Sequence, residues 1–156
     1  MLSFYLCGMN AIDIYNLRPH NFVDGRIEYN RSKTKRKRKD AAFISIKIVE
    51  NAEPILEKYI GKLHLQYAES STLNRAINIG LKQLLNINKM PYITFYWARH
   101  SFANLARNRC RMSKDDVALA LNHSDDYYKT TDIYLEKDWD IVDEVQAAVI
   151  SLIDDI

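Results

Sequence analysis

The chain has 156 residues, and its content of 47% hydrophobic and 27% charged residues is typical of one soluble globular domain rather than of a disordered chain. Four glycines and three prolines are few, which favours helices, and no apolar run reaches the roughly 18 residues that a membrane-spanning helix needs. The net charge of +2 conceals an asymmetry, because seven of the nine residues 31–39 are basic, whereas seven acids follow residue 134.

The first part of the chain predicts a short helix and then a β-hairpin. Residues 11–17 (AIDIYNL) are typical of a helix, and the two segments that follow alternate in side-chain character as strands do. The alternating positions are Ile27, Tyr29, Arg31 and Lys33 in the first segment and Ala42, Ile44, Ile46 and Ile48 in the second. We therefore expect Lys33 at the end of a strand, held by the sheet, and residues 35–39 in a mobile tip.

From residue 50 onward the pattern is helical. Apolar residues spaced by three and four predict helices over residues 55–60, 73–85 and 94–107. A fourth helix over residues 113–121 would begin at Ser113, whose spacing from Asp116 resembles a capping box.

The remaining segments are a polar loop that leads into a short helix over residues 123–135 and an amphipathic helix over residues 139–156. The apolar stripe of the last helix could pack on its own core or on a neighbouring subunit. These elements together predict an α+β fold that is predominantly α-helical, with a small β-hairpin or sheet.

The sequence predicts no metal site, no disulfide framework and no cofactor. Cys7 and Cys110 do not have metal-ligand spacing, and the four histidines are scattered along the chain. There is no recognisable secretory leader, so we expect a cytoplasmic location. The chain opens abruptly in apolar sequence (MLSFYLCGMN), from which we expect that an upstream domain is missing.

Several basic residues and one tyrosine occur in an order that suits phosphoryl transfer. Such a reaction needs positive groups around the phosphate oxygens, a nucleophile in line and an acid for the leaving oxygen. Arginine binds phosphate with two parallel hydrogen bonds, lysine has a proton to give, and tyrosine can form a phosphoester. The candidates, in chain order, are Lys33, Arg99 with His100, His123 and Tyr134.

Four segments resemble, in the same order, the motifs of the tyrosine recombinases, which are the phage-type and transposon-type integrases. Residues 96–106 (YWARHSFANLA) resemble the HxLRHxxA box, and residues 119–135 (LALNHSDDYYKTTDIYL) resemble the LGHxS…TxxxY segment. Residues 29–46 resemble the lysine-bearing hairpin, and residues 5–17 (YLCGMNAIDIYNL) resemble the TGLRxxEL segment. The resemblance extends from Phe4 to about Leu135. Within the family, the chain is similar to the integrases of conjugative transposons.

The resemblance implies that the nucleophile is Tyr134, which would attack a DNA phosphate and form a 3′-phosphotyrosyl intermediate. Tyr127 and Tyr128 are the alternatives. Lys33 would be the general acid for the 5′-oxygen, with Lys35 as its rival.

The remaining site residues would bind or support the phosphate. By the resemblance, Arg99 would clamp a non-bridging oxygen, His123 would hydrogen-bond the phosphate, and His100 would brace the site. Tyr96 occupies the position where the first histidine of the box is usual. It lies three residues before Arg99, so the two side chains share a helix face. Asn122 replaces the usual glycine before His123, which asparagine can do because it tolerates left-handed backbone.

The main departure from the family pattern is at Asn10, which occupies the position of the first catalytic arginine. An asparagine can donate hydrogen bonds but carries no charge, and losing an oxyanion-stabilising donor costs roughly 10²- to 10³-fold in other enzymes. Arg18 or Arg26 could supply the missing charge. Asp13 takes the place of the usual glutamate.

The leading hypothesis is therefore the catalytic domain, residues 1–156, of a site-specific DNA integrase whose N-terminal DNA-binding domain lies outside this chain. Double-stranded DNA is the expected partner, and self-association on DNA would use the C-terminal helix, residues 138–156. The alternatives are a degenerate recombinase fold that binds DNA without cutting it, a type IB topoisomerase, and a helical scaffold with a basic loop. The residues expected to grip DNA phosphates are Arg31, Lys35, Arg36, Lys37, Arg38 and Lys39.

Overall fold

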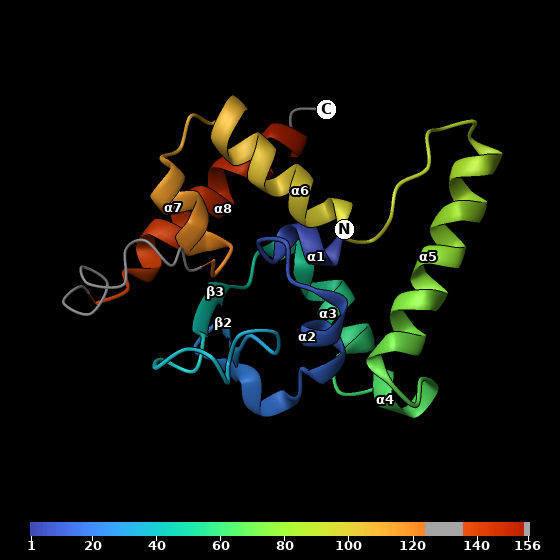
Figure 1. The fold of residues 1–156 in the computed structure, drawn as a ribbon, viewed down its shortest axis with the longest axis horizontal. Helices are drawn as coiled ribbons and strands as arrows, with labels where there is room; N and C mark the ends of the chain where they lie inside the picture. Colours follow the sequence, from blue (N-terminus) through green and yellow to red (C-terminus); the bar gives the residue numbers. More distant parts are fainter. Residues whose placement is uncertain (124–135, 155–156) are drawn as a thin grey trace.

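A computed structural model describes residues 1–123 and 136–154 of the chain. The fold is mostly helical with one small antiparallel sheet, which confirms the α+β class (Figure 1). The first half contains α1 (Leu2–Tyr5), α2 (Ala11–Asn16), η1 (Pro19–Asn21), β1 (Phe22–Val23), β2 (Arg26–Asn30), β3 (Phe43–Lys47) and η2 (Glu50–Ala52). The second half contains α3 (Glu53–Tyr59), α4 (Leu63–Gln66), α5 (Ser70–Ile87), α6 (Trp97–Asn104), η3 (Leu105–Arg109), α7 (Lys114–Ala120) and α8 (Trp139–Asp154).

The predicted hairpin is confirmed as β2 and β3, which pair antiparallel with Ile27 opposite Ile46. The first strand ends earlier than expected, at Asn30, so the prediction that Lys33 lies at a strand end is wrong. The amides of Thr34 and Lys35 bond back to the carbonyl of Arg31, and this tight turn ends the pairing. The two-residue strand β1 adds a third member to the sheet.

The predicted helices agree with α2, α3, α5, α7 and α8. The side chain of Ser113 accepts a hydrogen bond from the amide of Asp116, which caps α7 as expected. Helix α6 begins at Trp97, three residues later than predicted, and runs on into the π-helical segment η3.

Helix α8 packs on its own chain rather than presenting its apolar stripe to a neighbour. Val142, Val145 and Val149 are fully buried in the core, together with side chains of α1, the sheet and α6. The side chain of Gln146 donates to the carbonyls of Tyr5 and Lys47, which fastens α8 to α1 and β3. The stripe is therefore part of the core of this domain, and self-association through residues 138–156 stays a prediction.

The helices lie on two sides of the N-terminal segment. Figure 1 shows α6, α7 and α8 grouped together beside α1, while the long helix α5 stands on the other side and packs against α2. An extended segment leads from α5 to the start of α6, which brings α6 back across α1 (Figure 1). Within the part of the chain that the structure describes, no helix is long and apolar enough to cross a membrane.

Candidate active site

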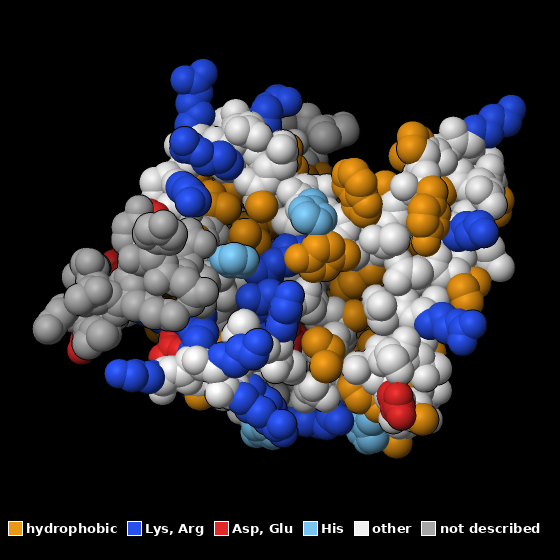
Figure 2. Space-filling model, viewed as in Figure 1, with side chains coloured by type: hydrophobic (Ala, Val, Ile, Leu, Met, Phe, Trp, Pro, Cys, Tyr) orange, Lys and Arg blue, Asp and Glu red, His pale blue; other side chains and the backbone are white. Residues whose placement is uncertain are grey.

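Three segments that are distant in sequence meet at an open pocket of about 430 Å³. They are the start of α2, the turn that follows β2, and the residue before α6. The residues that line the pocket are Asn10, Ile12, Arg31, Ser32, Lys33 and Tyr96. Four of these were predicted as catalytic or DNA-binding residues, namely Asn10, Arg31, Lys33 and Tyr96. In Figure 2, Lys and Arg side chains gather near the centre of the face shown, bordered by histidine and hydrophobic side chains.

Arg99 lies beside this pocket on α6, and only 7% of its surface is exposed. Its guanidinium donates to the carbonyl of Gly8, at 3.3 Å, and to the carbonyl of Leu121, at 2.6 Å. Two backbone carbonyls thus hold the side chain from opposite sides, one before α2 and one after α7. No ion pair joins Arg99 to a carboxylate within the described residues.

Gly8 allows the close approach that places Arg99. Its backbone has a positive φ of +72°, and a Cβ atom there would lie 2.8 Å from the Cα of Arg99. A larger residue would have to displace the backbone of α6, because real Cβ atoms do not come so near to other carbon atoms. Gly8 therefore lets α6 come close enough for Arg99 to take its position in the site.

Arg31 is a second buried guanidinium in the same place, with 5% of its surface exposed. It donates to the carbonyl of Asn122 at 3.2 Å, while its Nε has no hydrogen-bond partner in the structure. The pKa of Arg99 is lowered, first because the group is buried and next because the charge of Arg31 repels it. Two neighbouring positive charges without a bound carboxylate create a strong local preference for an anion.

Sequence reasoning assigned Arg31 to the general DNA grip and missed its place in this pocket. The signal was present, because Arg31 shares the parity of Ile27 and Tyr29, which face inward from β2. A charged residue in phase with buried ones is unusual, and it indicates a built site rather than a surface contact.

One acid lies close to this cationic group. Asp13 is buried on α2, and its Oδ1 accepts a hydrogen bond from the amide of Ser32 at 2.8 Å, which positions the turn. Its Oδ2 has no partner in the structure. The charge of Asp13 favours protonated Arg99, but it acts more weakly on the pKa of that group than Arg31 does.

Asn122 joins the end of α7 to the hairpin. It has the left-handed backbone that was predicted for this position, with a φ of 49°. Its side-chain nitrogen donates to the carbonyl of Ala42 at 2.7 Å, and its side-chain oxygen accepts from Arg38 at 2.8 Å. The next residue, His123, is exposed, and its amide bonds to the carbonyl of Ala118. Asn122 therefore fixes the position of His123, which follows the end of α7.

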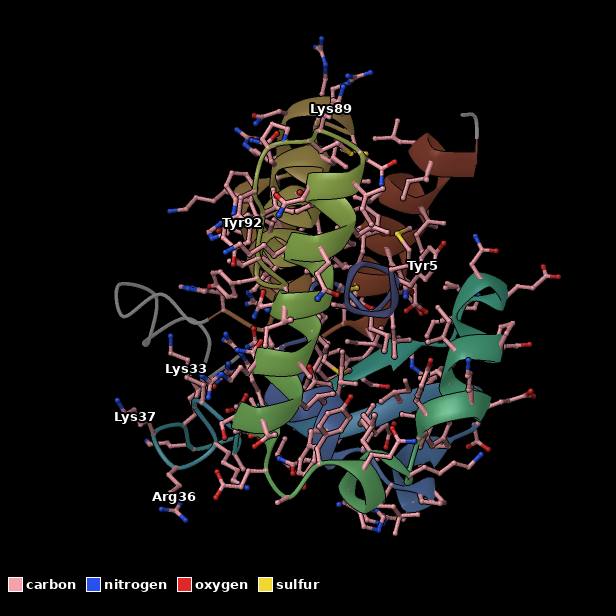
Figure 3. All side chains as sticks on the ribbon, turned by 90° about the vertical axis from the view of Figure 1, so that its right-hand side faces the viewer. Tyr5, Lys33, Arg36, Lys37, Lys89 and Tyr92 are labelled. Carbon is pink, nitrogen blue, oxygen red and sulfur yellow. The ribbon has the colours of Figure 1, made fainter. Side chains whose placement is uncertain are left out.

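The basic tip contains both exposed and committed side chains. Lys33 is exposed and lines the pocket, while Arg36 and Lys37 point away from the body of the protein (Figure 3). Arg38 instead binds Asp40 through two hydrogen bonds, in addition to its bond to Asn122, and its role as a DNA contact stays a prediction. Lys35 and Lys39 are exposed, as expected for DNA-binding residues.

Neither arginine proposed as a substitute for the first catalytic arginine reaches the pocket. Arg18 donates to the carbonyls of Tyr15 and Leu17, and Arg26 forms a two-point ion pair with Asp143 of α8. Asn10 lines the pocket from the start of α2, without a hydrogen bond from its side chain to the helix. Arg31 is the arginine that lines the pocket together with Asn10.

The histidine of the box, His100, is exposed and packs its ring edge-on against Tyr96, with 4.7 Å between the ring centres. It does not line the pocket, and its supporting role stays a prediction. Tyr134 and its alternatives Tyr127 and Tyr128 lie outside the described residues. No group of three or more His, Cys, Asp or Glu side chains is placed to hold a metal ion in residues 1–123 and 136–154.

Comparison with known proteins adds no relative. No protein-family model matches the chain, and no curated protein and no solved structure matches it significantly. The assignment of a function therefore depends on the motifs of the sequence and on the geometry of the pocket.

Proposed function

We propose that this chain is the catalytic domain of a tyrosine recombinase that cuts and rejoins DNA strands through a 3′-phosphotyrosyl intermediate. The observation that carries the proposal is the pair Arg31 and Arg99, two buried guanidinium groups whose charges repel each other, with no ion-paired acid in the described chain; Arg31 lines the pocket. Lys33 lines the same pocket. Such an arrangement suits a tetrahedral phosphate, whose oxygens accept several charge-assisted hydrogen bonds at once.

Each residue would have a distinct part in the reaction. Arg31 and Arg99 would bind the non-bridging oxygens and stabilise the charge that develops on them. The hydroxyl of Tyr134 would attack phosphorus, so that the bond from phosphorus to the 5′-oxygen breaks as the phosphotyrosyl bond forms. Lys33 would give its proton to the departing 5′-oxygen, and the 5′-hydroxyl of a second strand would later reverse the reaction.

The neutral and aromatic residues would orient the phosphate. Asn10 lines the pocket together with Arg31 and Lys33 and can donate a hydrogen bond through its amide. Tyr96 can donate one through its hydroxyl, and His123 would complete the set from the end of α7. His100 would hold the ring of Tyr96 in place through their edge-on contact.

A nicked duplex that releases a short fragment on cleavage tests the proposal, because loss of the fragment traps the enzyme on DNA. We expect a covalent protein–DNA band from the wild-type chain and none from Tyr134→Phe. Tyr59→Phe, on α3, is the matched control and should trap as well as wild type. A trapped band that persists in Tyr134→Phe would contradict the choice of nucleophile.

The second candidate is a recombinase fold that binds DNA but does not cut it, and Asn10 favours it because the position is neutral. The same duplex separates the two functions. Binding to the duplex without any trapped band would support the second function, DNA binding without cleavage. Double-stranded DNA is the proposed partner in both cases.

A further inference from the structure

Two large aromatic side chains remain exposed at the start of α6, and the first of them, Tyr96, lines the cationic pocket. Tyr96 is 49% exposed and Trp97 is 51% exposed, although they belong to the first turn of a helix that is otherwise packed on the core. The ring of His100 lies edge-on to both, with ring centres 4.7 Å from Tyr96 and 6.3 Å from Trp97. We call the rings of Tyr96 and Trp97, with His100 between them, the aromatic platform.

The other tryptophan of the chain shows the usual alternative. Trp139 is half-buried, packs its ring against Phe43 at 5.7 Å and is covered by Lys137. Trp97 makes no other ring or cation–π contact in the described chain than its edge-on contact with His100. An exposed tryptophan and tyrosine side by side form a surface that a ligand with a flat apolar face would cover.

The position of the platform indicates the chemistry of that ligand. Tyr96 lines the pocket together with Arg31 and Lys33, so the platform and the cations share an edge. Tyr96 also borders a second hollow of about 310 Å³, together with Phe95 and Asn74, which leaves open space on its other side. A ligand that fits both features carries a negative group next to a flat ring. Nucleic acid strands repeat this pairing of phosphate and base at every nucleotide.

We propose that the aromatic platform stacks on an unpaired nucleobase of the strand whose phosphate occupies the adjacent pocket. The inference rests on the proposed function, since it takes DNA as the ligand. A base within a duplex hides both faces by stacking on its neighbours, so the platform selects a base that has left the stack. Strand cutting would expose such bases next to the attacked phosphate, and the platform would hold the loose end in place.

Fluorescence of Trp97 tests the inference without any need for cleavage. Trp139→Phe leaves Trp97 as the sole tryptophan of the chain. We expect a single-stranded oligonucleotide, and a duplex with one unpaired base, to quench this fluorescence at low salt, and a fully paired duplex to quench it much less. Equal quenching by paired and unpaired DNA, or none by either, would overturn the inference.

Affinity for the same oligonucleotide gives the second measurement. Trp97→Ala should raise the dissociation constant roughly 5- to 150-fold, the range expected for one stacked base, while Trp97→Phe should keep most of the affinity. Tyr59→Ala is the matched control, because Tyr59 is an exposed aromatic residue of α3, outside the aromatic platform. A dissociation constant for Trp97→Ala equal to that of the control would overturn the inference.

The outcomes separate this inference from the proposed function. If the fluorescence is quenched and Trp97→Ala loses affinity, but no covalent band is trapped, the platform is supported on a protein that does not cut DNA. A trapped band with unchanged affinity in Trp97→Ala would overturn the platform alone. Quenching by polyglutamate as strong as that by DNA would also overturn it, in favour of an acidic protein partner.

Discussion

At the scale of single residues, the site depends on charges that the fold buries without neutralising. Arg31 and Arg99 are almost inaccessible, yet their described hydrogen bonds go to backbone carbonyls, which carry no net charge. A buried unpaired cation lowers stability unless something else compensates it. Functional sites commonly carry such a cost, because the groups that will bind a charged ligand must be in place before it arrives.

Replacing Arg31 separates its functional role from a structural one. We expect Arg31→Gln to reduce the rate of covalent trapping on the nicked duplex by roughly 10²- to 10³-fold, because a charge that stabilises the transition state is lost. The same change should leave the thermal midpoint unchanged or raise it, since the glutamine removes a buried charge. The measurements are the trapping rate at saturating DNA and the unfolding temperature.

Two comparisons make the Arg31 result interpretable. Lys39→Gln removes the same charge from an exposed position of the tip, and it should leave the trapping rate at saturating DNA unchanged. An Arg31→Gln protein that loses its activity only in proportion to a loss of folded protein would assign Arg31 a structural role instead.

At the scale of elements, a network of charges and amides holds the hairpin against the C-terminal half of the chain. Asp40 accepts from Arg38 and from Lys137, and Arg38 reaches on to Asn122 at the end of α7. The amide of Ala42 also donates to Asp40, at 3.0 Å. The Asp40 carboxylate therefore helps to fix the hairpin that carries Arg31 and Lys33 relative to His123, alongside the bonds of Asn122 to Arg31 and Ala42.

The network predicts how stability depends on pH. Burial pushes the pKa of Asp40 upward, but the hydrogen bonds from Arg38 and Lys137 outweigh it and hold that pKa below its usual range. A carboxyl whose pKa is lowered by folding stabilises the protein at neutral pH, and the stabilisation is lost as the pH falls through and below about 4. Asp40→Asn should therefore lower the urea midpoint at pH 7 and flatten its decline toward pH 3.

A matched acid tests whether the effect belongs to Asp40. Glu57→Gln removes an exposed carboxylate from α3, outside this network, and should leave the midpoint and its decline close to those of wild type. If Asp40→Asn and wild type lose stability in parallel as the pH falls, the Asp40 carboxylate does not hold the hairpin in place.

The helices and strands also show which elements can be predicted from the sequence and which cannot. Long periodic segments such as α5 and α8, and the alternation around Ile44 and Ile46, were predicted because burial on one face leaves a repeat of 3.6 or 2 residues. Helices α1 and α4 span four residues each, about one turn, so they are too short to show a repeat. Whether these two segments form helices is decided by their packing on the rest of the chain.

The candidate site was predictable in its composition and less so in its geometry. Asn10, Lys33 and Tyr96 were found by motif, and the structure places all three around one pocket. Arg31 is held in its buried position by Asn122, and Arg38 bonds to the same residue, roughly ninety residues away in the chain. Such contacts leave no local pattern, so seven basic residues in one run cannot be sorted by sequence alone.

At the scale of the whole molecule, charge is distributed unevenly. The face shown in Figure 2 presents many Lys and Arg side chains and few acidic ones among the described residues. The acids of the last segment instead include Asp143, which pairs with Arg26, and exposed residues of α8 such as Asp140 and Glu144. A molecule of this kind should meet a polyanion in one orientation, with the hairpin toward it.

The salt dependence of DNA binding measures how many of these cations take part. Each contact with a phosphate releases counterions, so the logarithm of the affinity should fall with the logarithm of the salt concentration at a slope of about −0.9 for each contact. The exposed cations of the hairpin tip that form no ion pair with an acid of the described chain are Lys33, Lys35, Arg36, Lys37 and Lys39. They predict a slope of about −4 to −5, measured by titrating a fluorescent duplex at several salt concentrations. Lys37→Gln should reduce the slope by about one, whereas Arg38→Gln should leave it unchanged, because Arg38 is already bound to Asp40. An equal change in both variants would mean that the tip rearranges on DNA and releases Arg38 from the carboxylate.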